Sequence, residues 1–155
     1  MNDPNFARSV VYLIDHNSGG TLGVVVNRLT AVDVPSVLDG WRSVVADPPG
    51  LFYGGPVAPD GVLAVGQRAD RTLTIVDLDE HRPNDYVRVR FFHGYSGWGP
   101  RQLDGELDEA AWVVVDGDPD DVFDATPDTL WRRVLARQSG ETAWLAHYPD
   151  DVNVN

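Results

Sequence analysis

The chain has 155 residues, of which 43% are hydrophobic, and it carries a formal net charge of −12 at pH 7. It contains no cysteine, which excludes disulfide bridges, zinc–thiolate sites, iron–sulfur clusters and thiol catalysis. Every basic residue is an arginine, so Schiff-base chemistry and the lysine of a P-loop are also excluded.

The N-terminal part predicts a β-hairpin. Residues 9–16 and 21–27 are rich in β-branched apolar residues, and the segment between them, NSGG, is dense in turn formers. Gly23 lies inside the second strand, where a glycine indicates a bulge or a close approach of another backbone segment.

A helix and a third strand are predicted next. In residues 33–47 apolar side chains recur at helical spacing, Asp33 is a suitable N-cap, and Pro35 falls in the first turn, where its missing N–H costs nothing. Residues 51–57 then read as a short strand that runs into a Gly-Gly-Pro turn.

Further apolar segments predict more strands, at residues 61–67, 72–78 and 85–94. In the last of these, Val87 and Val89 alternate with Arg88 and Arg90. This alternation predicts a half-solvated strand whose sheet has one face partly open to water, with the arginines directed toward it.

The C-terminal part predicts a loop, two helices and a strand. Residues 94–99, GYSGWG, read as a glycine-rich loop, and Pro100 opens a helix. Residues 110–117 predict a strand, followed by an acidic connector and a last helix near Pro127. Residues 150–155 read as a tail. The alternation of strands and helices predicts an α/β fold, with residues 1–155 forming one layered domain in which a mixed β-sheet is flanked by about three helices.

Motifs for most catalytic chemistry are missing. The spacing around Ser96 is not that of a nucleophile elbow, and the glycines of GYSGWG do not match a dinucleotide fingerprint. The four histidines form no metal-binding pair, and we expect neither a metal nor a cofactor. The clustered aspartates are more typical of solvated surface or helix capping than of a site.

The stretch FFHGYSGWGPRQ remains a candidate site. A helix beginning at Pro100 offers unpaired N–H groups; Arg101 and Gln102 flank it, Trp98 offers a stacking face, and His93 is near in sequence. Such a place suits a small anion or a carboxylate. A purely structural role is an equally good interpretation of this stretch: the glycines form a tight turn and Trp98 packs in the core.

Hydropathy indicates a soluble protein, and the absence of cysteine fits the reducing cytoplasm. The apolar runs are far shorter than the roughly 20 residues needed to span a bilayer, and the first residues lack the pattern of a signal peptide. The acidic surface disfavours phosphate backbones, so we expect no direct DNA binding and no membrane association. Arg132, Arg133 and Arg137 form a small basic cluster, which reads as a solvated helix face.

Four blocks, in order along residues 3–115, carry a resemblance: DPNFARSVVYLIDH, GGTLGVVVNR, FYGGPV and GYSGWGPRQLDGEL, the last followed by AAWVVV. They resemble the AlgH/YqgE family of bacterial proteins. The matching signature positions are Arg8, Ser9, His16, Gly23, Asn27, Arg28, Gly54, Gly55, Pro56, Gly94, Tyr95, Gly97, Trp98, Gln102, Leu103 and Glu106. Leu29 departs from the family's pattern, which has proline there.

The resemblance implies a compact, cytoplasmic α/β protein without an established biochemical activity. Some members carry the label of transcriptional regulator because of a genetic link to alginate production, which says nothing about mechanism. The family also implies a further strand before the Asp-Pro-x-Phe segment, which this sequence lacks. We therefore expect an exposed edge near residues 9–15, at which the chain could self-associate.

The signature segments each end a predicted strand, so we expect them to meet in one cleft. The predicted ligand-binding residues are His16, Asn27, Arg28, Gly54, Gly55, His93, Tyr95, Ser96, Trp98, Arg101 and Gln102. The favoured interpretation is a regulatory or binding domain for a small anionic ligand or a protein partner. The alternative is an enzyme of unknown class that uses His16, Asn27, Arg28 and His93.

Overall fold

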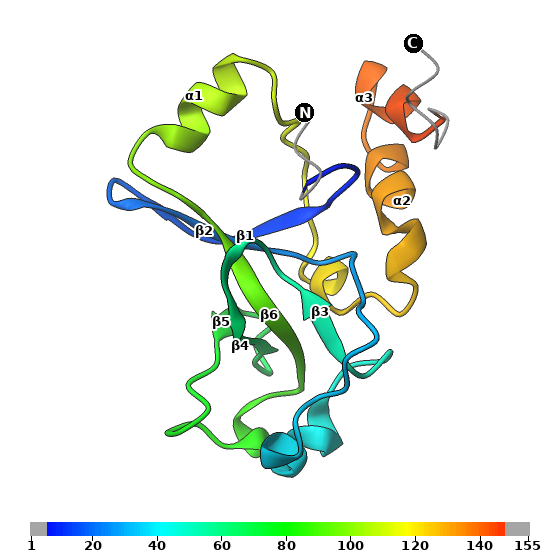
Figure 1. Ribbon diagram of the computed structural model, residues 1–155. Coiled ribbons are helices and arrows are strands. Elements are labelled where there is room, and N and C mark those ends of the chain that lie inside the picture. The colour runs from blue at the N-terminus through cyan, green and yellow to red at the C-terminus, as the bar shows by residue number, and fades with distance from the viewer. Residues whose placement is uncertain (1–5, 148–155) are drawn as a thin grey trace.

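The computed structural model describes residues 6–147, so the predicted tail and the first residues of the Asp-Pro-x-Phe segment lie outside the described residues. The strands are β1 (Val11–Asn17), β2 (Gly20–Val25), β3 (Leu51–Tyr53), β4 (Val57–Gln67), β5 (Leu73–Ile75) and β6 (Arg88–Trp98). The α-helices are α1 (Gln102–Asp108), α2 (Leu130–Ala136) and α3 (Glu141–Trp144) (Figure 1). The 3-10 helices are η1 (Ser36–Val44), η2 (Pro83–Asp85), η3 (Pro119–Phe123), η4 (Pro127–Thr129) and η5 (Leu145–His147).

The strands form one mixed sheet, which confirms the predicted α/β class. Its order is β1-β2-β6-β4-β5, and β3 pairs with β6. The β3–β6 pairing is parallel and the others are antiparallel. Strand β6 is central because it pairs with β4 and β3 along its first half and with β2 at its end. Strand β1 lies at one end of the sheet.

The predicted hairpin forms from β1 and β2, with a register shift between Leu13 and Asp15. Gly23 lies opposite Leu13, and a Cβ atom there would come within 2.8 Å of the carbonyl oxygen of Tyr12. The close backbone approach predicted from Gly23 is therefore confirmed.

The core lies on both faces of the sheet. One cluster joins the sheet to η3 and α2, and its members include Val24, Phe52, Phe92, Val122 and Leu130. A second cluster covers the other side around η1, with Trp41, Tyr86, Val89 and Phe91 among its members.

Several predictions of local structure are wrong. Residues 94–98 continue β6 instead of forming a loop, and residues 110–117 form no strand and do not join the sheet. The helix predicted over 33–47 is the 3-10 helix η1, interrupted at Leu38 (φ −101°, ψ 15°).

The predicted solvation of the β6 arginines is wrong for Arg90, which is 1% exposed. Its guanidinium lies 4.3 Å from the centroid of the Phe52 ring. It donates hydrogen bonds to the carbonyl oxygens of Asp47 (2.6 Å), Val122 (3.2 Å) and Asp124 (2.9 Å). These carbonyls replace water around the charge, which is why an arginine can be buried there.

Among the helices in residues 6–147, none has both the length and the apolar character needed to cross a membrane.

Candidate functional site

The glycines of the predicted loop form a crossing between two chain segments. Gly94 has φ +71°, and a Cβ atom on it would overlap the carbonyl of Gly55. A Cβ atom on Gly54 would in turn overlap the carbonyl of Gly94. The Ser96 hydroxyl is buried and donates to the Gly54 carbonyl (3.0 Å). Gly54, Gly55 and Ser96 therefore hold the segment that follows β3 against β6.

Other predicted site residues also hold backbone in place. The Asn27 amide accepts a hydrogen bond from the Val10 N–H (2.9 Å) and donates to the Arg8 carbonyl (2.9 Å). The Gln102 side chain accepts from the Gly99 N–H (2.9 Å), just before α1. These contacts use the amide groups that a ligand would need.

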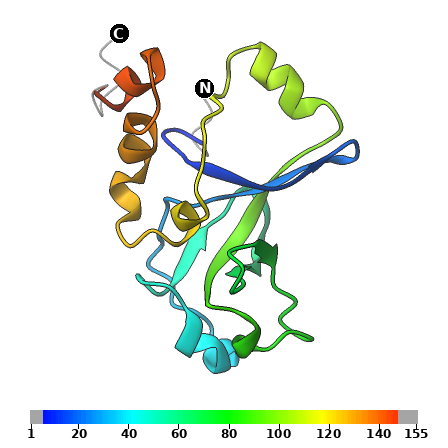
Figure 2. The ribbon, with the colours of Figure 1, turned by 180° about the vertical axis from the view of Figure 1, so that it is seen from behind.

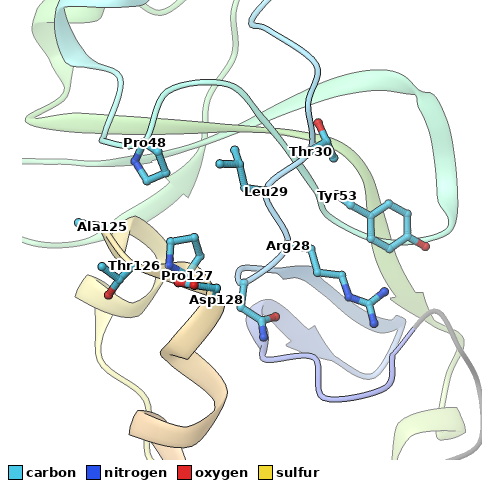
Figure 3. Close-up of a pocket in the computed structure, with 10 residues that line it drawn as sticks. Arg28, Leu29, Thr30, Pro48, Tyr53, Ala125, Thr126, Pro127 and Asp128 are labelled. Atoms are coloured by element: carbon cyan, nitrogen blue, oxygen red, sulfur yellow. The ribbon is translucent and has the colours of Figure 1, made fainter. Parts of the chain in front are cut away.

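Arg28 and Asn27 line a groove of about 710 Å³, which we call the arginine groove. Figure 3 shows Arg28 beside Tyr53 at one end and Pro48 near the start of the η4 segment at the other. The Arg28 guanidinium donates to the Ala7 carbonyl (2.9 Å) and lies 5.9 Å from the centroid of the Tyr53 ring. The complete lining is Asn27, Arg28, Leu29, Thr30, Pro48, Tyr53, Ala125, Thr126, Pro127 and Asp128.

His16 and Trp98 lie elsewhere, on a second concavity beside β1. Two adjoining cavities of about 430 and 230 Å³ share lining residues and lie between residues 9–13 and residues 111–115; together we call them the strand groove. Trp98 is 7% exposed, and its ring packs edge-on against Trp112 at 5.8 Å between centroids. The His16 imidazole is within 2.5 Å of the Thr21 hydroxyl.

The remaining predicted residues are dispersed. The His93 ring contacts the Tyr53 ring at 5.4 Å between centroids, and Tyr95 packs against the first core cluster. Arg101 lines a polar pocket of about 470 Å³ together with His16 and Asp104.

The predicted single cleft is therefore divided among different cavities. The reason is that residues 93–98 belong to the strand β6. A strand rises ~3.3 Å per residue and therefore separates these side chains, whereas a loop could have brought them together.

The sequence did not identify Leu107 of α1 or residues 112–115 as a possible binding surface. Residues 112–115 fall within the strand predicted over residues 110–117. In the structure Val113 and Val114 are 55% and 75% exposed. Figures 1 and 2 both show this segment, in yellow, running from α1 past β1 toward η3.

The strand groove contains buried polar atoms without hydrogen-bond partners. The Ser9 hydroxyl and the Trp112 indole nitrogen are both of this kind, and both residues line the smaller cavity. An unpaired buried polar group costs about 1–3 kcal/mol, so native proteins rarely leave one without a reason.

The acidic connector is largely neutralised by arginines. Asp121 pairs with Arg137 through two hydrogen bonds (2.7 and 2.8 Å), and Asp124 pairs with Arg133 in the same way (2.6 and 2.9 Å). The hydrogen bond from Arg133 lowers the pKa of Asp124 below its ordinary value. Arg133 and Arg137 are exposed, as expected for a solvated face, and in addition both are ion-paired with aspartates. Within residues 6–147, no group of three or more histidine and carboxylate side chains is placed to hold a metal ion.

Comparison with known proteins places this fold and sequence in a family. The AlgH-like family model, DUF179, matches residues 1–143. This chain belongs to the AlgH-like family. The resemblance inferred from the four sequence blocks is therefore confirmed.

This AlgH-like protein is similar to proteins of Streptomyces, Corynebacterium and Pseudomonas. It is 43% identical to a UPF0301 protein of Streptomyces avermitilis, over all of this chain and 90% of that protein. The crystal structure of DIP2367 from Corynebacterium diphtheriae superposes with a TM-score of 0.85 at 28% identity, over 96% of this chain and 86% of that one. The solution structure of AlgH from Pseudomonas aeruginosa superposes with a TM-score of 0.69 at 26% identity, over 97% and 89%. None of these names states an activity.

Proposed function

We propose that this AlgH-like domain is a binding domain, that its site is the strand groove, and that the groove holds a segment of a protein partner. The observation that carries the proposal is the apolar character of the groove. Its lining includes Trp98, Leu103, Leu107, Trp112 and Val134. Exposed concave apolar surface of this kind is typical of interaction sites.

The placement of the polar candidates supports binding over catalysis. Catalysis needs a nucleophile or a general base within hydrogen-bond reach of a shared reacting atom. Here Ser96 and Asn27 hold backbone groups, while His16 and Arg28 line different cavities. Among residues 6–147, His16, Asn27, Arg28 and His93 do not line one cavity together, which favours binding over the enzyme hypothesis.

The small-anion hypothesis has less support than the protein partner. His16 and Arg101 share a polar pocket, but the Asp104 carboxylate lines the same pocket and repels an anion. In the arginine groove, Asp128 lines the surface together with Arg28.

A selection with matched variants tests the proposal. Random peptides displayed on phage are selected on the wild-type protein and counter-selected on Val113→Arg, which places a bulky cation in the groove. Val37→Arg is the control, because Val37 is also exposed (87%) but lies on η1. We expect peptides that bind the wild type and Val37→Arg equally, and Val113→Arg at least about tenfold more weakly. Failure to enrich any such peptide would contradict the proposed site.

A further inference from the structure

The strand groove lies between the outer edge of strand β1 and the segment of residues 112–115, and both have backbone groups without backbone partners. In the β1–β2 ladder the Val26 N–H donates to the Val10 carbonyl, so Val10 and Tyr12 face β2. Because hydrogen bonding alternates along an antiparallel strand, the backbone groups of Val11 and Leu13 point away from β2. Within residues 6–147 they have no backbone partner.

The opposite wall is a second unpaired edge. Hydrogen bonds hold the chain on both sides of residues 112–115. Before them, the Ala111 N–H donates to the Glu106 carbonyl. After them, the Asp116 N–H donates to the Gln138 side chain, and the Asp116 carbonyl accepts a hydrogen bond from it. Between these anchors, residues 112–115 belong to no helix or strand, with a bend at Trp112, and form no backbone–backbone hydrogen bond with any other described residue. Both segments line the same cavities.

From these edges we propose that the groove is a β-strand acceptor, in which one extended segment of a partner protein pairs with β1 on one side and with residues 112–115 on the other. This inference rests on the proposed function and adds the conformation and chemistry of the ligand. Backbone hydrogen bonds supply affinity in this mode of recognition, and side-chain pockets supply specificity.

The two walls of the groove define the side chains of the inserted strand. One face of the groove is closed by Leu103 and Leu107 of α1, and the other by Val134 of α2. A strand buried on both faces is continuously apolar instead of alternating. The ligand is therefore a run of about four β-branched or aliphatic residues, matching the length of the free edge at residues 112–115.

Charge determines what flanks that apolar run. The larger cavity is lined by the exposed Asp104 and by Asp121, which Arg137 neutralises; Arg8 lines the smaller cavity, and the whole chain carries a net charge of −12. Arginine or lysine on either side of the apolar run would therefore be attracted. A second copy of this chain is disfavoured as the occupant, because two such acidic surfaces repel each other.

The test uses acetyl-Arg-Val-Ile-Val-Val-Arg-amide as the probe, with tryptophan fluorescence of Trp98 and Trp112 as the readout. We expect saturable binding to the wild type and to Val37→Arg, and at least about tenfold weaker binding to Val113→Arg. Replacing the terminal arginines with glutamates should weaken binding by about tenfold at low salt and by less at high salt.

Backbone N-methylation of the probe, one residue at a time, distinguishes the binding modes. An inserted strand uses N–H groups on both edges, so methylation at each central residue should weaken binding at least about tenfold. If N-methylation weakens binding only at alternate residues, the probe pairs with a single edge. This result would overturn the proposal that it pairs with both edges of the groove. Groove-dependent peptides that tolerate methylation everywhere would overturn the strand mode while leaving the proposed function intact. Concentration-dependent dimers that the probe dissociates would identify a second copy as the occupant and overturn the partner assignment.

Discussion

Gly94 and Gly97 lie three residues apart on β6 but have different environments. At Gly94 a side chain would overlap the Gly55 carbonyl, and φ is +71°. At Gly97 the nearest atom to a Cβ would be on the Tyr95 ring at 3.5 Å, an ordinary contact. We expect Gly94→Ala to lower the free energy of unfolding by about 3 kcal/mol or more, and Gly97→Ala by less than about 1 kcal/mol. Urea denaturation measures both, and equal losses would contradict the crossing at Gly94.

Arg90 should be a structural residue whose loss destabilises the fold. Desolvation lowers its pKa to about 10, so it remains charged at neutral pH. Arg90→Met leaves three backbone carbonyls without their donor and should cost about 3 kcal/mol; Arg90→Lys should recover part of this. In the same urea experiment, Arg42→Met removes an exposed pair with Asp39 and should change stability by less than about 0.5 kcal/mol. A similarly small effect at Arg90 would show that its carbonyl contacts contribute little.

Arg90 also illustrates what the sequence can predict at a single position. The alternation of valine and arginine correctly indicated a strand and wrongly indicated solvent around Arg90. The hydrogen-bond acceptors of Arg90 are the backbone carbonyls of residues 47, 122 and 124. Every residue has a backbone carbonyl, so the amino-acid sequence does not reveal these partners. A buried arginine satisfied by distant backbone cannot be distinguished from an exposed one by local pattern.

At the scale of elements, the pair of Asp124 and Arg133 joins the connector to α2. The pKa of Asp124 is lowered in the folded state, chiefly by the hydrogen bond from Arg133. Its stabilising contribution is therefore present above the ordinary pKa of 3.8 and lost as the pH falls through the lower folded value.

Replacing Asp124 with asparagine should remove that contribution. We expect Asp124→Asn to lose about 1–2 kcal/mol at neutral pH and to show a shallower fall in stability below pH 3.8. Asp39→Asn, in an exposed pair, serves as the control. Urea denaturation over a series of pH values measures both effects. If Asp124→Asn retains the full acid dependence of the wild type, another group is responsible for it.

Sequence periodicity predicted a strand or helix correctly where the folded chain supplies a neighbouring element that pairs with it or packs against its apolar side. The hairpin β1–β2 and helix α1 form near their predicted positions. Residues 110–117 have the composition of a strand, but pairing requires a free edge at the correct distance, which is a property of the tertiary fold. The opposite error concerns residues 94–98, which were predicted as a loop and form part of a strand. Their glycines are typical of a loop, but β6 requires Gly94 where it crosses Gly54 and Gly55.

At the scale of the whole molecule, charge argues against nucleic-acid binding. The net charge is −12, and Arg133 of α2 and Arg137, which follows this helix, are paired with aspartates. Affinity for DNA depends on cations that neutralise phosphates. We expect no specific binding to a labelled DNA duplex at about 150 mM salt by fluorescence anisotropy. A complex that survives nonspecific competitor DNA would favour a direct role in transcription.

The strand acceptor is tested most directly by amide hydrogen exchange with and without the Arg-Val-Ile-Val-Val-Arg probe. The two edges, residues 11–13 and 112–115, are distant in sequence and meet across the groove. We predict that the probe slows exchange in both segments together, by about tenfold or more at the newly bonded amides, and leaves η1 unchanged. Slowing in only one segment, or in neither, at a saturating concentration of the probe would contradict insertion of a strand between them.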